Sequence, residues 1–282
     1  MGREENKEIF QDTEKLCRTN PALIQAWKSS SEKQKLILEN EAVIYEKQIY
    51  ETPTKIIVSK KRTFEAAMDY PGKKVAVLNF ASANNPGGGV VNGSSAQEEC
   101  LCRCSTLYYN LTEDFMWKNF YQPHRHAANP IHNDDLIYTP DVVIFKLDTP
   151  YPRLLPQNKW AKVNVITCAA PNLRERPSNA FNTGDGNQAV KISPAQLEQI
   201  HIQRGRKILA TAAANKNEVI ILGAFGCGAF MNNPEIVANA YTKLVEEFKN
   251  AFKVIEFAIY CSPRDDSNFR IFSDRIKGIV NC

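Results

Sequence analysis

Hydrophobic residues recur at two different spacings along the chain. Up to residue 50 they lie three or four positions apart, as in KEIFQDTEKLC (7–17) and EKQKLILENEAVIYEKQ (32–48). This spacing places them on one face of a helix, so it predicts helices in both segments. Asn20 followed by Pro21 predicts another short helix between them, because Asn caps a helix well and Pro fits its first turn.

Beyond residue 50, short runs rich in Val, Ile and Leu alternate with segments of helical periodicity. This alternation predicts a mostly parallel sheet covered on both faces, and therefore an α/β fold. We expect residues 1–50 to be a helical extension packed on a domain of residues 51–282. The predicted strands are 54–60, 73–82, 135–147, 162–170, 218–225 and 254–261. The predicted helices of this part are 63–70, 96–111, 193–216, 233–252 and 266–280.

The composition is that of an ordinary globular protein, with 43% hydrophobic and 23% charged residues over 282 positions. The net charge of +4 permits a polyanionic ligand, but sequence-specific nucleic-acid binders concentrate more positive charge than this. No run resembles a transmembrane helix, and the charged start MGREENKEIF does not resemble a signal peptide. We therefore expect a cytoplasmic monomer that engages neither a membrane nor specific nucleic-acid sequences.

The cysteines are expected to be reduced thiols that mostly pack as small buried groups. Three of them, in CLCRC (100–104), are spaced by two residues, which is not a zinc-binding spacing. His124, His126 and His132 lie in a predicted loop, where we expect packing or surface roles rather than metal ligation. No metal and no cofactor is predicted. The eight cysteines are Cys17, Cys100, Cys102, Cys104, Cys168, Cys227, Cys261 and Cys282.

Two predicted strands end in glycine loops. These are VLNFASANNPGGG (77–89) and VIILGAFGCGAFMNNPE (219–235), and each leads into a predicted helix. Ligands of open α/β sheets bind beyond the carboxyl ends of the strands, where glycine backbones and helix N-termini form phosphate sites. The chain lacks GxGxxG after an early strand and GxxxxGK[ST], so neither a Rossmann site nor a P-loop is predicted. The polar stretch 168–193 is long enough to be a functional loop.

Two adjacent glutamates follow the first glycine loop. Ser95 and Glu98 fit the S-x-x-E capping box, so we expect Glu98 to accept the backbone N–H of Ser95. Glu99 has no capping role, and neighbouring helical side chains diverge by about 100°, so one carboxylate can bind or cap while the other performs chemistry. A helix N-terminus lowers a carboxyl pKa, whereas a general acid needs a raised one. Desolvation or a neighbouring negative charge must therefore dominate at such a site.

The segment GGGVVNGSSAQEE (87–99) resembles the GGG…QEE signature of poly(ADP-ribose) glycohydrolases. NFASANNPGGG (79–89) looks like the bacterial-type branch of that family, and LGAFGCGAFMNNP (222–234) resembles its diphosphate loop. The resemblance covers most of the chain and is weak in the first 50 residues. It implies a macrodomain, which is a three-layer α/β/α fold with a mixed, mostly parallel central sheet that binds ADP-ribose.

The resemblance also implies roles for single residues. Glu99 would be the catalytic acid, Glu98 would hydrogen-bond the ribose hydroxyls, and Gln97 would lie beside the ligand. Phe230 would pack against the distal ribose. The remaining implied ligand contacts are Gly87, Gly88, Gly89 and Val90 beside the diphosphate and distal ribose, and Gly226, Cys227, Gly228 and Ala229 around the diphosphate.

The implied reaction is hydrolysis of the ribose–ribose O-glycosidic bonds of poly(ADP-ribose), which releases ADP-ribose. Glu99 would protonate the departing oxygen and then activate water as a carboxylate. A hydrolase for mono-ADP-ribosylated proteins would use the same acid and is the main alternative. A non-catalytic ADP-ribose-binding module is less favoured, because its expected mark is loss of the acid and both glutamates are present. A regulatory protein that acts through its N-terminal helices is a third alternative.

Overall fold

A seven-stranded mixed sheet forms the centre of the computed structural model, which describes residues 2–180 and 182–280. The strand order is β1-β4-β5-β3-β6-β7-β2. β4 pairs antiparallel with β1 and β5, and the remaining neighbours pair parallel, so the sheet is mixed and mostly parallel, as expected. The strands are β1 (Lys35–Ile37), β2 (Lys55–Ser59), β3 (Val75–Phe80), β4 (Leu136–Ile144), β5 (Ala161–Cys168), β6 (Val219–Leu222) and β7 (Val254–Ala258).

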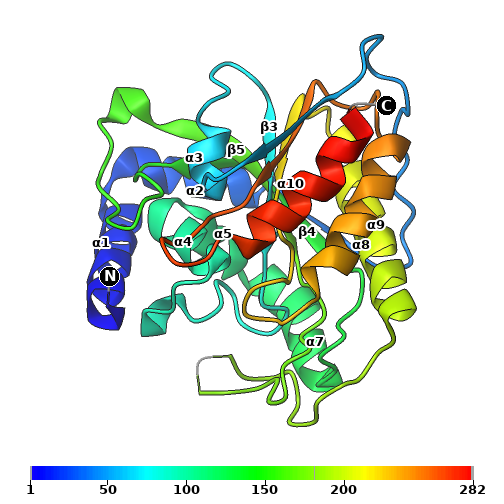
Figure 1. Cartoon of the computed structure of the whole chain (residues 1–282). Coiled ribbons are helices and arrows are strands. Elements are labelled where there is room, and N and C mark those ends of the chain that lie inside the picture. Colours follow the sequence, from blue (N-terminus) through cyan, green and yellow to red (C-terminus); the bar gives the residue numbers. More distant parts are fainter. Residues whose placement is uncertain (1, 181, 281–282) are drawn as a thin grey trace.

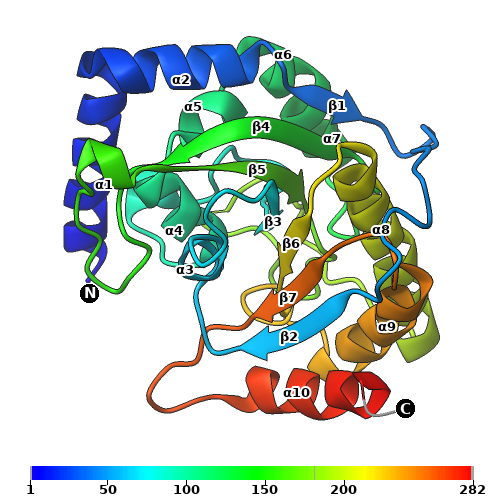
Figure 2. The same cartoon turned by 90° about the horizontal axis from the view of Figure 1, so that it is seen from above.

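Helices cover both faces of the sheet, and each face has its own hydrophobic core (Figures 1 and 2). Alternate residues of β3 supply the two cores, Ala76 and Leu78 on one face and Val75 and Val77 on the other. The first face carries α8 (Pro194–Ala214), α9 (Pro234–Glu247) and α10 (Ser267–Val280). The second carries α1 (Arg3–Thr19), α3 (Thr63–Ala67), α4 (Gln97–Cys104) and α5 (Leu107–Leu111).

The remaining elements connect these layers. The predicted short helix is α2, in which the Asn20 side chain caps the N–H of Ala22 at 3.0 Å and Pro21 is the first residue. A predicted loop around residues 122–135 is instead partly helical. The connecting elements are α2 (Pro21–Ser31), η1 (Val90–Asn92), α6 (Asp114–Met116), η2 (Trp117–Tyr121), α7 (Gln122–Ala127) and η3 (Gln157–Lys159).

The helix predicted over 32–48 is wrong. Residues 35–37 form β1, an edge strand that pairs antiparallel with β4, and residues 38–54 are irregular. Ile44, which the helical spacing placed on an apolar face, is 89% exposed, so that face does not exist. Pairing with the open edge of β4 outweighed a local periodicity that is compatible with either structure. The division of the chain at residue 50 stays a prediction.

The helix predicted over 96–111 is interrupted. It forms α4 and α5, which are separated by Ser105 and Thr106. Thr106 donates its N–H to the Val143 carbonyl at 3.0 Å and accepts the Val143 N–H on its hydroxyl at 3.1 Å. The end of β4 therefore draws these two residues out of the helix and fixes where α4 ends.

Packing between α8 and α9 leaves no room at Gly205. A Cβ atom placed there would lie 2.5 Å from Leu244 Cδ1 and 3.5 Å from the Tyr241 ring. We expect Gly205→Leu to lower the free energy of unfolding by about 1–3 kcal/mol, because the helices must separate. Urea denaturation measures this change. Gln203→Leu, at an exposed position of the same helix, should change it by less than about 0.5 kcal/mol. Equal effects of the two substitutions would contradict the close packing.

Candidate active site

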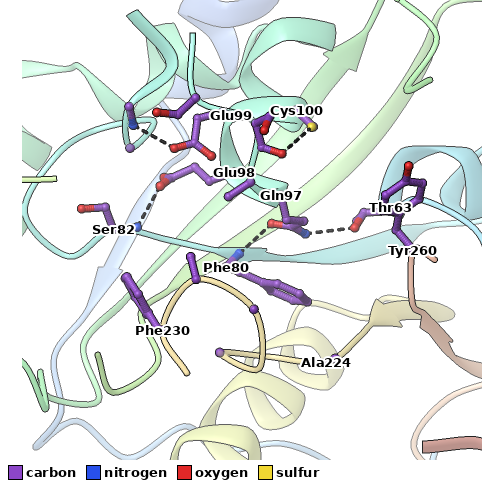
Figure 3. Close-up of a pocket in the computed structure, with 18 of the residues that line it drawn as sticks. Thr63, Phe80, Ser82, Gln97, Glu98, Glu99, Cys100, Ala224, Phe230 and Tyr260 are labelled. Carbon is purple, nitrogen blue, oxygen red and sulfur yellow. Dashed lines mark hydrogen bonds between the residues drawn. The ribbon is translucent and has the colours of Figure 1, made fainter. Parts of the chain in front are cut away.

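A cleft of about 700 Å3 opens at the carboxyl ends of the central strands. Phe80 is the last residue of β3, Ala224 and Ile259 come just after β6 and β7, and all three line the cleft. Both glycine loops predicted from the sequence reach this cleft, as expected for a ligand site of an α/β sheet. Figure 3 shows Phe230 across the cleft from the glutamates of α4, with Thr63 and Tyr260 at its far end.

The three consecutive glycines form a tight turn against α4. Gly87 and Gly88 have φ angles of 69° and 59°, the left-handed region that favours glycine. A Cβ atom on Gly88 would lie 2.6 Å from Glu99 Oε1 and 3.1 Å from Glu98 Oε2. The next residue, Gly89, donates its N–H to Glu99 Oε1 at 2.8 Å. The glycines therefore let the backbone approach two carboxyl groups that a side chain would displace.

Glu98 does not form the predicted capping box. α4 begins at Gln97, so Ala96 is the N-cap residue, and it makes no side-chain cap bond. The Glu98 carboxyl crosses instead to β3, where Oε2 accepts the Ser82 N–H at 2.8 Å and Oε1 accepts the Asn79 amide at 3.2 Å. Asn79 belongs to β3, Ser82 lies two residues beyond its end, and both are buried.

Burial decides the protonation of this pair. Glu98 is 3% exposed and Glu99 is 7% exposed. Burial raises the pKa of Glu98 to about 8, against the opposing effect of the bonds from Ser82 and Asn79. Burial also raises the pKa of Glu99, against the N–H of Gly89 and the charge of Arg103. Desolvation thus outweighs the helix N-terminus, as a general acid requires.

The two oxygens of Glu99 differ in their surroundings. Oε1 is held by Gly89, whereas buried Oε2 has no hydrogen-bond partner among the residues that the structure describes. Both oxygens of Glu98 are engaged by the protein. Of the two carboxyl groups, Glu99 therefore has the free oxygen with which to exchange a proton with a ligand.

Gln97 fastens the start of α4 to its neighbours. Its Oε1 accepts the N–H of Phe80 at 2.8 Å, and its Nε2 donates to the Leu78 carbonyl at 2.7 Å and to the Thr63 hydroxyl at 3.0 Å. The side chain lines the cleft, but its amide bonds to β3 and α3. Gln97 therefore ties three elements together beneath the glutamates.

The second glycine loop follows β6. Gly226 has a φ of 78°, and a Cβ atom there would lie 2.6 Å from Ala170 Cβ. Buried Asn232 holds the loop from behind, where its amide donates to the carbonyls of Gly226 at 3.2 Å and Phe230 at 3.2 Å. The bonds from Asn232 therefore fix the shape of the loop. Gly228 and Ala229 are exposed at the cleft.

The structure brings most of the predicted site residues together. Three others do not line the cleft. Gly87 packs against the Tyr108 ring, Val90 is fully buried in the core, and the Cys227 thiol lies near the Phe225 carbonyl. The predicted residues that line the cleft are Gly88, Gly89, Gln97, Glu98, Glu99, Gly226, Gly228, Ala229 and Phe230.

Three arginines line the cleft, Arg3, Arg62 and Arg174, and none of them was predicted from the sequence. Arg174 lies 5.6 Å from the centre of the Phe230 ring and is held by the Asn172 side chain at 3.0 Å. Arg62 lies at the other end, 4.2 Å from the centre of the Tyr260 ring. Arg174 comes from the polar stretch 168–193, whose length predicted a functional loop but did not single out this residue. Arg62 had no signal, since single arginines are common on surfaces.

Two of the three histidines of segment 122–135, His124 and His132, bond within the protein. His124 contacts the Phe120 carbonyl at 2.7 Å, His132 contacts Asp185 at 2.9 Å, and His126 is exposed. No metal-binding group of three or more His, Cys, Asp or Glu occurs in residues 2–180 and 182–280. Over the same residues, every helix is too short or too polar to cross a membrane. All cysteines but Cys282 are free thiols, and Cys282 lies outside the described residues.

Known proteins resemble the chain in sequence and in structure. The family model described as the catalytic domain of microbial-type PARG matches residues 7–147. Poly(ADP-ribose) glycohydrolase from Thermomonospora curvata has a TM-score of 0.81 at 27% identity, covering 96% of this chain and 99% of that chain. The same enzyme bound to the inhibitor ADP-HPD has a TM-score of 0.77 at 27% identity, with coverage of 96% and 99%.

The corresponding enzyme from Deinococcus radiodurans, in complex with ADP-ribose, has a TM-score of 0.75 at 30% identity. That match covers 90% of this chain and 97% of that chain. No curated protein matches. The family match includes the first glycine turn and both glutamates, and the structural matches confirm the predicted macrodomain-like α/β fold. The chain belongs to the microbial-type poly(ADP-ribose) glycohydrolases.

Proposed function

We propose that Glu99 performs the acid–base chemistry of poly(ADP-ribose) hydrolysis, the glycosidase activity of this family. One observation carries this assignment: Glu99 lines the cleft, its carboxyl is anchored through Oε1, and its buried Oε2 has no hydrogen-bond partner among the described residues. Burial raises the pKa of Glu99, which favours its protonated form relative to that of an exposed glutamate. The substrate is a chain of ADP-ribose units, and the product is ADP-ribose.

The reaction starts with Glu99 protonated. Its proton passes to the glycosidic oxygen, the bond from that oxygen to the anomeric carbon breaks, and the electron pair leaves with the oxygen. The sugar becomes an oxocarbenium-like cation that the substrate's own diphosphate stabilises. Water then adds to the anomeric carbon and gives its proton to the Glu99 carboxylate, which restores the acid. A positioned acid of this kind contributes about 10²- to 10⁴-fold.

Glu98 is not an opposed nucleophile in this proposal. Its carboxyl belongs to the same helix as Glu99, and both carboxyl groups approach Gly88 from one side. The usual pair of glycosidase carboxylates lies on opposite sides of the sugar. We assign Glu98 to hydrogen-bonding of the ribose hydroxyls, and Gln97 to holding the start of α4 beside the ligand.

The second glycine loop is assigned to the diphosphate. Backbone N–H groups of residues 226–229 would bind its oxygens, as such loops do in other phosphate sites. Phe230 would pack against the distal ribose, and Arg174, beside that ring, adds positive charge. The turn of residues 87–90 would border the distal ribose, with Gly87 and Val90 supporting it from behind. Solved relatives in complex with ADP-ribose and with the inhibitor ADP-HPD support ADP-ribose as the ligand of this cleft.

We also propose that the protein acts as a monomer in the cytoplasm on poly(ADP-ribose) or on ADP-ribosylated proteins. Free thiols at the described cysteines support a reducing compartment. The net charge of +4 supports attraction of a polyanionic substrate rather than of a specific nucleic-acid sequence.

Glu99→Gln should lower kcat on poly(ADP-ribose) by about 10²- to 10⁴-fold, because the amide cannot supply the proton. The dissociation constant for ADP-ribose, measured by titration calorimetry, should change little. Glu256→Gln is a matched control, since Glu256 is equally buried but lies on β7 and bonds Ser59 and Tyr70. It should leave kcat unchanged. Normal turnover by Glu99→Gln would refute the assignment.

The pH dependence of kcat follows from the protonated starting state. Burial raises the pKa of Glu99, so the acid is fully present at low pH and is lost as the pH rises through that raised pKa. We therefore expect kcat to fall on the alkaline side, over a limb that Glu99→Gln removes. Initial rates between about pH 5 and about pH 9 measure it. A wild-type rate that rises throughout this range would show that the carboxylate, not the acid, starts the reaction.

A further inference from the structure

The N-terminal helix α1 contacts the segment of residues 87–94 directly. We call this segment, which starts with the three glycines, the catalytic turn. The Asn6 side chain, 3% exposed, donates through Nδ2 to the Gly93 carbonyl at 3.0 Å. Gly93 has a φ of 73°, and a Cβ atom there would lie 2.2 Å from the Arg3 carbonyl oxygen. The first turn of α1 is therefore in backbone contact with the segment that follows the three glycines, and it borders the cleft itself.

Gly93, which contacts α1, and Gly89, which bonds Glu99, belong to the same hydrogen-bonded turn. Gly93 donates its N–H to the Val90 carbonyl at 3.0 Å, and Ser94 donates to the Gly89 carbonyl at 3.1 Å. Gly89 in turn donates its own N–H to Glu99 Oε1 at 2.8 Å. Gly93 is thus linked through a closed, hydrogen-bonded turn to the N–H that bonds Glu99.

Buried contacts anchor α1 to the rest of the fold, so the helix can hold the catalytic turn in place. Lys146 at the end of β4 is 2% exposed, and its ammonium donates to the Ile9 carbonyl at 3.0 Å and to the Thr13 hydroxyl at 2.8 Å. Phe10 is buried with an edge contact to Tyr108, at 4.9 Å between ring centres. The same tyrosine ring packs against Gly87. The helix lies beside α4 and α5 at the margin of the fold (Figure 2).

We propose that Asn6 and the first turn of α1 are positioning elements of the active site, which set the catalytic turn against Glu99. This inference rests on the function proposed above. It gives the N-terminal helix a part in catalysis: α1 holds the Gly93 end of the turn while Glu99 receives the Gly89 end. The diphosphate loop after β6 is a separate segment, so loss of this grip impairs turnover more than ligand binding.

Gly93→Ala tests the contact between α1 and the turn. The added methyl group would overlap the Arg3 carbonyl oxygen and push the turn away from α1. Gly72→Ala is the matched control, because Gly72 has a φ of 75° and no described atom lies within 4 Å of its ideal Cβ position. Both variants carry the same left-handed backbone strain, but only the first disturbs the catalytic turn.

We expect Gly93→Ala to lower kcat on poly(ADP-ribose) by about 10- to 100-fold, the cost of a small misplacement in an active site. The Kd for ADP-ribose should rise by a smaller factor than kcat falls, and Gly72→Ala should keep kcat within about twofold. Unchanged kcat in Gly93→Ala, or equal losses in both variants, would overturn the inference. If Gly93→Ala is fully active while Glu99→Gln is inactive, only the role of α1 fails; an active Glu99→Gln would instead refute the proposed chemistry.

Asn6→Asp provides a second test that adds no bulk. In its ionised form the carboxylate has the shape of the amide but cannot donate to the Gly93 carbonyl, so at alkaline pH kcat should again fall by a larger factor than the Kd for ADP-ribose rises. Glu8→Gln, on the exposed face of α1, is its control and should leave both values unchanged. Wild-type kcat in Asn6→Asp would contradict a positioning role for Asn6.

Discussion

Two carboxyl groups that are adjacent in the sequence are buried at the start of α4, and each must find partners where water cannot supply them. Glu98 bonds the backbone of Ser82 and the amide of Asn79, and Glu99 bonds the backbone of Gly89. These bonds compensate only part of the desolvation, so the pKa of both groups is raised. A carboxyl whose desolvation is only partly compensated holds its proton to a higher pH than an exposed glutamate does.

The need of these two buried glutamates for hydrogen-bond partners explains why several neighbouring elements contact the short helix α4. The glycine turn has to come close enough for a backbone N–H to reach Glu99, which excludes a side chain at Gly88. Gln97 joins α4 to β3 and α3, while α1 holds the far end of the turn through Asn6. Buried contacts on several sides therefore hold the free oxygen of Glu99 in one position.

The sequence predicted the strands that are buried on both faces, because runs such as 75–80 and 219–222 leave few alternatives. It failed where a tertiary contact decided the outcome. Residues 35–37 joined the edge of β4, and Thr106 was drawn to Val143, although local periodicity favoured helices. Glu98 bonded β3 instead of capping α4, since the donors of Ser82 and Asn79 become neighbours only in the folded sheet.

The glycine loops and the glutamates could be found from sequence because their backbone demands restrict residue type. Arg62 and Arg174 could not, since their positions depend on distant rings and loops.

The central claim is that the free oxygen of Glu99 faces the scissile bond. A crystal structure of the full chain with ADP-ribose tests it most directly. The anomeric hydroxyl of the distal ribose should lie within about 3 Å of Glu99 Oε2. A ribose bound elsewhere, or a Glu99 carboxyl turned away from it, would contradict the claim.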